Sequence, residues 1–301
     1  MGSEMCIRDR MYPSRFRYEA PSSLEEAIDL LHRGAGEAKV LAGGQSLVPL
    51  LKLRFASPEM LVDINNIPGL GYLKPEPDGS LRVGALCRHA ELERSAVLVA
   101  QQPTMAAAAP LIADPIVRNR GTLVGSLCHA DPQGDWASVV TALGGQVVAA
   151  GPNGRRAIPV ADFVSGPFQN VLAYDEIAVE AVIPAAKGTR AGGYLKLERR
   201  VGDFATAGVA VALETSGNLV TRAGIALTGV GGSTIDAVEA GRVLVGKQLD
   251  AGTIVAAADL AAQASRPRTD HRGSAEYKRQ IVHTFVVRIL TRITESAERA
   301  A

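Results

Sequence analysis

The pattern of apolar and polar residues predicts a chain that mixes helices with strands. Residues 21–34 begin with a Ser-x-x-Glu capping pattern and then place apolar side chains three or four positions apart, as in an amphipathic helix. Short apolar runs at 39–41 and 60–64 predict strands, and the run at 47–53 predicts a helix between them. The N-terminal part is therefore expected to form a compact β-loop-α-β unit.

The middle of the chain alternates strand signals with turn residues. Pro-Glu-Pro-Asp-Gly at 75–79 predicts a hairpin turn before a strand at 81–86. An Ala-rich helix is expected to follow, and Asp114-Pro115 is expected to close it. Alternating residues at 146–150 and 155–160 predict two further strands.

The C-terminal third begins after a stretch at 184–193 that is rich in Gly, Ala, Lys and Arg and is expected to be a linker. Residues 193–213 and 219–229 predict strands of an antiparallel sheet. Helices are expected at 233–245, 251–264 and 275–296.

These elements predict an α+β protein of two domains. The first is expected over residues 11–187, with subdomains at about 11–65 and 66–187, and the second over 190–296. Residues 1–10 mix both charges without the apolar stretch of a signal peptide, and we interpret them as an artefactual leader.

Composition and charge exclude several classes of function. The 301 residues carry 32 Lys and Arg against 31 Asp and Glu, a net charge of +1 that offers no general attraction for nucleic acid. No apolar stretch is long enough to predict a transmembrane segment. The three cysteines, Cys6, Cys87 and Cys128, do not form the close pairs that zinc or iron-sulfur clusters need. A reducing cytosol is the expected compartment.

The first candidate for chemistry is a glycine loop between the strand at 39–41 and the helix at 47–53. It consists of Ala42, Gly43, Gly44, Gln45 and Ser46. Glycine lets backbone N–H groups approach phosphate oxygens closely, although a plain turn has the same composition. No Gly-Lys-Ser/Thr follows, so the loop is not of the Walker type.

A second glycine and hydroxyl segment spans residues 121–126. Two such loops could bind the two phosphates of a dinucleotide from opposite sides. A nearby carboxylate such as Asp135 could then accept hydrogen bonds from the ribose hydroxyls. His129, Asp131 and Asp135 are an alternative metal set, but Pro132 interrupts regular ligand spacing and no second cluster completes a shell. Gly-Val-Gly-Gly-Ser-Thr at 229–234 lacks the last glycine of the Rossmann fingerprint and predicts a strand-to-helix turn.

A charged cluster marks the start of the second domain. Strand alternation places Tyr194, Lys196 and Glu198 on one face. This pattern fits a solvated edge strand, and it also fits a lysine whose charge stabilises the anionic reduced form of a redox ring.

Together these segments resemble the FAD-binding medium subunit of the molybdenum hydroxylases, particularly the aerobic carbon monoxide dehydrogenase type, with a relationship to the flavin domain of xanthine dehydrogenase. The family's Ala-Gly-Gly-(His/Gln)-Ser motif stands at 42–46. Its Arg-Asn-Arg-Gly-Thr and His-Ala-Asp-Pro context stands between 118 and 132. The resemblance continues at 172–177, 196–203 and 271–277, and it covers about 11–293.

The resemblance implies a two-subdomain FAD-binding fold of the vanillyl-alcohol-oxidase type, followed by an α+β C-terminal domain. In the implied site the loop at 42–46 binds the FAD pyrophosphate, with Thr122, Gly125 and Ser126 on its other side. Val124 departs from the family, which has glycine there. A positive φ at this position would be costly for a β-branched residue.

Four further residues receive a role from the resemblance. Asp135 is expected on the ribose or adenosine side, and Leu172 is expected to pack on the flavin or adenine. Lys196 is expected near the isoalloxazine edge, and Tyr194 is expected to shield one flavin face. No residue is expected to act as a general acid or base, and no metal ligand is expected.

The implied function is electron transfer. A large subunit with molybdopterin oxidises the substrate, a small subunit carries [2Fe-2S] clusters, and FAD on this chain passes the electrons to an external acceptor. The expected assembly is a dimer of heterotrimers in the cytoplasm, with the inner face of the membrane as an alternative site for the assembled complex. A stand-alone FAD-dependent reductase and a cofactor-free scaffold or binding protein of the same fold are the competing hypotheses. The substrate and the acceptor stay open.

Overall fold

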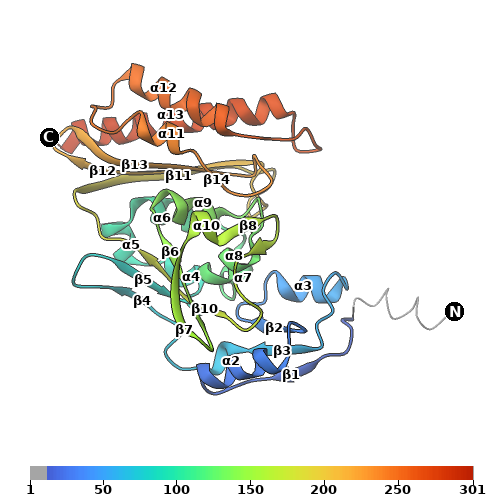
Figure 1. The fold of residues 1–301 in the computed structure, drawn as a ribbon. Helices are drawn as coiled ribbons and strands as arrows, with labels where there is room; N and C mark the ends of the chain where they lie inside the picture. Colours follow the sequence, from blue (N-terminus) through green and yellow to red (C-terminus); the bar gives the residue numbers. More distant parts are fainter. Residues whose placement is uncertain (1–11, 301) are drawn as a thin grey trace.

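The computed structural model describes residues 12–300, and the leader predicted at residues 1–10 lies outside them. Three layers follow one another along the chain (Figure 1). The N-terminal unit lies at the bottom of the view, an antiparallel sheet with its helices in the middle, and a second antiparallel sheet with three helices at the top. The expected mixture of helices and strands is thus present.

The N-terminal unit is a three-stranded parallel sheet of order β1-β3-β2. Its elements are β1 (Arg17–Glu19), α2 (Leu24–Arg33), β2 (Ala38–Leu41), α3 (Leu47–Lys52) and β3 (Met60–Asp63). The hydroxyl of Ser23 accepts a hydrogen bond from the Glu26 amide, and the Glu26 carboxylate accepts one from the Ser22 amide. These bonds begin α2 where the capping pattern predicts it, and the β-loop-α-β unit is confirmed.

The central layer is a five-stranded antiparallel sheet of order β4-β5-β10-β6-β7. Its strands are β4 (Leu73–Pro75), β5 (Leu81–Gly84), β6 (Gln146–Gly151), β7 (Gly154–Pro159) and β10 (Ile177–Ile183), and a small hairpin adds β8 (Val164–Gly166) and β9 (Gln169–Asn170). Its helices are α4 (His89–Glu93), α5 (Ala96–Gln101), α6 (Pro103–Ala108), α7 (Pro115–Arg118), α8 (Leu123–His129), α9 (Asp135–Ala142) and α10 (Val160–Phe163).

The Ala-rich helix expected before residue 114 is wrong as one element. It is divided into α5 and α6 at Gln102, the residue before Pro103, because proline disfavours a helical conformation in the residue that precedes it. Asp114 and Pro115 do not close a helix but begin α7. The Asp114 carboxylate accepts from the Val117 amide at 2.8 Å, and Pro115 occupies the first helical position, where its missing N–H costs nothing.

The C-terminal layer is a four-stranded antiparallel sheet of order β11-β12-β13-β14, covered on its outer face by helices (Figure 1). Its elements are β11 (Thr189–Leu197), β12 (Ala207–Ser216), β13 (Leu219–Thr228), β14 (Ile235–Asp236), α11 (Val238–Arg242), α12 (Ala251–Ala264) and α13 (Ala275–Ala300). The linker predicted over 184–193 is shorter, because β11 begins at Thr189. The helix predicted over 233–245 is likewise confined to α11.

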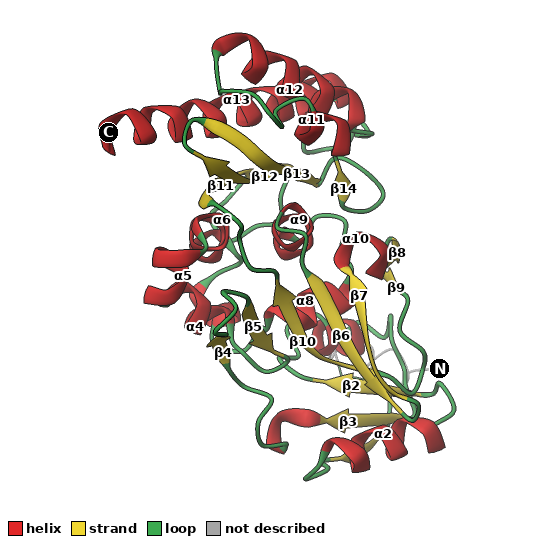
Figure 2. Ribbon diagram, turned by 60° about the vertical axis from the view of Figure 1, so that its left-hand side comes forward, coloured by secondary structure: helices red, strands yellow, loops and turns green. Residues whose placement is uncertain are grey.

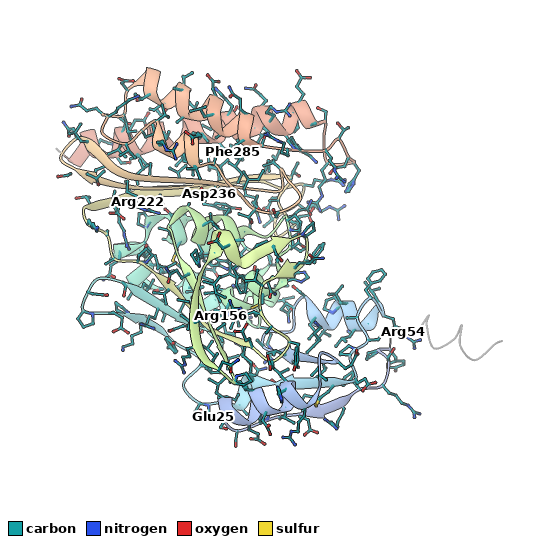
Figure 3. All side chains as sticks on the ribbon, in the orientation of Figure 1. Glu25, Arg54, Arg156, Arg222, Asp236 and Phe285 are labelled. Atoms are coloured by element: carbon teal, nitrogen blue, oxygen red, sulfur yellow. The ribbon has the colours of Figure 1, made fainter. Side chains whose placement is uncertain are left out.

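The two faces of this sheet belong to different cores. Alternate residues of β12 point to opposite sides, so that Val209, Val211 and Leu213 pack under α12 and α13 while Ala210 and Ala212 join the core of the central layer. Phe285, labelled in Figure 3, packs from α13 onto the outer face. The small inner residues let α6 and α9 approach the sheet closely, as Figure 2 shows between the two sheets.

Close backbone contacts seal the junction of the central and C-terminal layers. A Cβ on Gly224 of β13 would overlap the carbonyl of Ala142 on α9, so only glycine fits this approach. Arg222, labelled in Figure 3, donates to the same carbonyl at 2.9 Å. Within residues 12–300 no helix is both long and apolar enough to cross a membrane.

Candidate functional site

The two glycine loops lie against each other, although about eighty residues separate them in the chain. A Cβ on Gly43 would stand 2.8 Å from the Gly121 Cα and closer still to the Arg120 carbonyl oxygen. Real Cβ atoms do not approach backbone this closely, so glycine at position 43 is required for the contact. The N-terminal unit and the central layer therefore meet at these loops.

The first loop presents unused backbone donors. It runs from β2 into α3, and no hydrogen bond between described residues is donated by the amides of Gly43, Gly44, Gln45 or Ser46. Gly44 has a φ of +74°, a conformation that glycine adopts without strain. The Gln45 side chain is exposed and makes a long 3.4 Å bond to the Gly43 carbonyl. Such a row of free N–H groups matches the oxygens of an anionic group.

The second loop leads into α8, whose first turn is capped by Thr122. The Thr122 hydroxyl accepts from the Gly125 amide at 3.0 Å. Val124 lies in the helix, its φ is not among the positive values of the described residues, and its side chain is 2% exposed in the core. Its amide donates no hydrogen bond within the described chain. The left-handed strain considered for this valine is absent, and its side chain is directed into the core.

A chain of hydrogen bonds joins the two loops behind their contact. The Asn65 side-chain amide donates to the Ala42 carbonyl at 2.8 Å, just before Gly43. The Arg88 guanidinium donates to the Asn65 side-chain oxygen and to the Arg120 carbonyl, each at 2.6 Å. Burial and then the charge of Arg120 lower the pKa of Arg88, and the guanidinium still stays charged because its ordinary pKa is so high.

His89 supports the second loop from its other side. Its backbone N–H donates to the Gly121 carbonyl at 2.9 Å, and its ring lies against Gly121, where any Cβ would stand 2.7 Å from a ring carbon. The indole N–H of Trp136 donates to His89 Nδ1 at 3.0 Å, so this nitrogen carries no proton. Burial, followed by the charges of Arg118 and Arg88, lowers the pKa of His89 to about 4.

The expected residues Asp135, Tyr194 and Lys196 form a buried cluster between α9 and β11. The Tyr194 hydroxyl donates to one carboxylate oxygen of Asp135 at 2.5 Å, and the Lys196 ammonium lies 3.4 Å from the other. Lys196 also pairs with Glu198 at 3.1 Å, and its side chain is 1% exposed. Burial raises the pKa of Asp135, while Lys196 and Tyr194 act against that rise. The cluster ties the C-terminal sheet to α9, the next helix after α8.

The remaining expected residues lie on or beside α8. Ser126 is half-buried in this helix. Leu172 is half-buried and packs against the core of the central layer. Its backbone N–H donates to the side-chain oxygen of Asn170, and the Asn170 side-chain N–H donates to the Cys128 carbonyl near the end of α8. His129 Nε2 lies 3.9 Å from a carboxylate oxygen of Asp131. Among the described residues no group of three or more His, Cys, Asp or Glu side chains could hold a metal ion.

Sequence patterns did not single out Asn65, Arg88, His89 or Trp136. None belongs to a local motif, and each reaches its partner across 23 to 47 residues. The available signal was weak: Asn65 follows a predicted strand, and Arg88-His89 follows another. Only tertiary packing brings these residues together, and Asn65 meets Arg88 where the N-terminal unit packs against the central layer.

Two family models match the chain. One is described as the FAD binding domain in molybdopterin dehydrogenase and matches residues 14–186. The other is described as the CO dehydrogenase flavoprotein C-terminal domain and matches residues 193–293.

Relatives and solved structures match along nearly the whole chain. The carbon monoxide dehydrogenase medium chain of Hydrogenophaga pseudoflava is 43% identical over 282 residues, which are 93% of this chain and 97% of that protein. The glyceraldehyde dehydrogenase medium chain of Sulfolobus acidocaldarius is 34% identical, over 92% and 98% respectively. A structure of the Hydrogenophaga pseudoflava carbon monoxide dehydrogenase lacking the Mo-pyranopterin moiety superposes with a TM-score of 0.90 at 41% identity, covering 94% of this chain and 98% of that one.

Proposed function

Because the chain belongs to the family of FAD-binding medium subunits of carbon monoxide dehydrogenases and related molybdenum hydroxylases, we propose that it carries electrons from a partner's [2Fe-2S] clusters to an external acceptor through FAD. The fold and the family that its motifs resemble are confirmed by these matches, and the chain is an oxidoreductase subunit. The observation that carries the proposal is the pair of adjoining glycine loops, with free amides at residues 43–46 in the first loop and at Val124 in the second.

The loops fit the most highly charged part of FAD. In the proposed site the diphosphate is held between the two loops. The amides of residues 43–46 lie on one side, and the start of α8 lies on the other with Thr122, Val124, Gly125 and Ser126. The contact between Gly43 and Gly121 keeps the two donor sets close enough to reach one ligand. Uncharged backbone donors suit a diphosphate because the glycines leave no side chain in the way.

FAD, when bound, supplies a ring that accepts electrons singly and holds two. The protein's part is to bind and orient it, and no described residue is assigned a proton transfer. Both oxygens of Asp135 are already engaged by Tyr194 and Lys196. We therefore propose that this cluster holds α9 and β11 in place. The expected contacts of Asp135 with the ribose or adenosine side, of Lys196 and Tyr194 with the flavin, and of Leu172 with the flavin or adenine stay predictions.

The chain needs partners for this function. Iron-sulfur clusters are held by sets of cysteine thiolates, and the two cysteines of the described residues, buried Cys87 and half-buried Cys128, are too few. A small iron-sulfur subunit and a large molybdopterin subunit complete the proposed complex, as a dimer of heterotrimers in the cytoplasm. Relatives named for carbon monoxide and for glyceraldehyde match this chain along its length, which supports substrate selection on the large subunit.

The test uses the FAD-loaded chain and the reduced iron-sulfur subunit expressed from the same genome. After anaerobic mixing in a stopped-flow instrument, the visible absorption of oxidised flavin is expected to bleach while the clusters reoxidise. The control is the same mixture with the FAD-free chain. Cluster reoxidation without flavin bleaching, or no reaction between two subunits that bind each other, contradicts the proposal.

A further inference from the structure

We propose that Asn65 and Arg88 form a clamp that fixes the gap between the two glycine loops, and that both are positioning residues for the FAD diphosphate. The inference rests on the proposed site, since a gap has meaning only for a ligand held by both loops. It concerns residues that belong to neither glycine motif.

The clamp acts in series. Ala42 O, Asn65, Arg88 and Arg120 O are joined by three hydrogen bonds of 2.8, 2.6 and 2.6 Å. Its two ends are the carbonyls that immediately precede Gly43 and Gly121, the residues at which the loops touch. Breaking either bond of Asn65 therefore removes this hydrogen-bonded connection between the loops, and loss of the Arg88 side chain removes the bonds to both Asn65 and Arg120.

Each member of the clamp is itself held. The Asn65 amides, backbone and side chain, donate to the Asp63 carboxylate at 2.9 and 2.5 Å, and Asp63 accepts from Tyr18 on β1 at 2.6 Å. These contacts anchor Asn65 to the parallel sheet. A side chain fixed by such supporting bonds holds a binding geometry more tightly than a free one.

Arg88 is anchored to the other subdomain. Its backbone N–H donates to the Glu91 carboxylate at 2.6 Å at the start of α4, and it forms an antiparallel bridge with Thr122. Its planar guanidinium reaches Asn65 and Arg120 through two different nitrogens. A lysine would keep the charge without this rigid fork.

The experiment measures the FAD dissociation constant of the full chain, freed of flavin, by quenching of flavin fluorescence. The variants are Asn65→Ala, Arg88→Ala, Arg88→Lys and the double alanine variant. Asn66→Ala and Arg94→Ala are matched controls, because both residues are exposed, Asn66 directly follows Asn65, and Arg94 ends the helix that Arg88 begins. Thermal unfolding of each FAD-free variant provides a readout of stability apart from binding.

Each single alanine variant is expected to bind FAD at least about tenfold more weakly than the wild type. Both substitutions remove a hydrogen bond that the charged Arg88 guanidinium donates. The dissociation constant of the double variant is expected to be at most about threefold higher than that of the single variant that binds FAD more weakly. The two effects are not additive because both substitutions break the same chain of hydrogen bonds. Arg88→Lys is expected to stay impaired, and the controls to bind as the wild type does.

Other results overturn the inference in recognisable ways. Full affinity in Arg88→Lys, together with a silent Asn65→Ala, indicates a direct attraction between the Arg88 charge and phosphate. Additive losses indicate two independent contacts, and losses that only follow the unfolding midpoints indicate a purely structural role. Unchanged affinity in all variants removes the clamp and leaves the proposed function standing, whereas a folded wild-type chain that binds no FAD removes both.

Discussion

Replacing Gly43 by alanine is the smallest change that separates the two loops. The added Cβ would lie 2.8 Å from the Gly121 Cα, 3.0 Å from the Arg120 carbonyl carbon and nearer still to the carbonyl oxygen. All three atoms are backbone, so no side chain can rotate away. The loops must move apart, and the amides on the two sides can no longer reach the same diphosphate in their original geometry.

The size of the effect follows from these distances. Ordinary contact begins near 3.4 Å, so the Gly121 Cα alone must retreat by about 0.6 Å. Forcing one extra carbon into a packed site costs about 1–3 kcal/mol. Binding FAD draws the loops together again, so this cost is subtracted from the free energy of binding. At 1.4 kcal/mol per tenfold, the dissociation constant of FAD rises about 5- to 150-fold.

The assay is a fluorescence titration of the FAD-free Gly43→Ala chain, with Gly71→Ala as the control. A Cβ at Gly71 meets nothing closer than 3.7 Å, and its φ is not in the left-handed region. The control is expected to bind FAD normally. Wild-type affinity in Gly43→Ala, with a correctly folded chain, would refute the reasoning that the loops share one ligand.

Three further predictions concern buried polar groups. Lys196→Met is expected to destabilise the chain by about 3–5 kcal/mol in urea unfolding, because it leaves the Asp135 carboxylate buried without its cation, and adding Asp135→Asn should recover most of the loss. Between pH 6.5 and about 4 the unfolded chain binds a proton at His89 that the folded chain does not. Acidification through this range should therefore lower the free energy of unfolding by about 3 kcal/mol, and the His89→Gln variant should show a smaller change with pH. Burial raises the pKa of both Cys87 and Cys128 to about 12, so peptide mapping after brief iodoacetamide treatment of the native chain should find both unmodified.

Local patterns predicted the elements whose signals are local. The capping residues of α2, the apolar face of α13 and the glycines at 42–46 all act over a few positions, and each could be identified from the sequence. Asp114-Pro115 was assigned to the wrong side of a boundary, because the pair suits a helix start as well as a stop.

The support of the site depended on tertiary structure. Arg88 reaches Asn65 only because the parallel sheet packs beside the central layer, and no periodicity in the sequence predicts that contact. The engagement of Asp135 by Tyr194 and Lys196 likewise depends on the docking of the C-terminal sheet onto α9. Val124 could be interpreted as strained from sequence, but its place inside α8 removes the strain.

The most direct test of the account is the nucleotide content of the purified chain. The full chain, expressed with its partner subunits and supplied with FAD, is denatured, and the released nucleotide is identified and quantified by chromatography. The account predicts FAD in near-equimolar amount, and a marked loss of it in Gly43→Ala. A well-folded chain that retains no FAD, alone or with its partners, would contradict it.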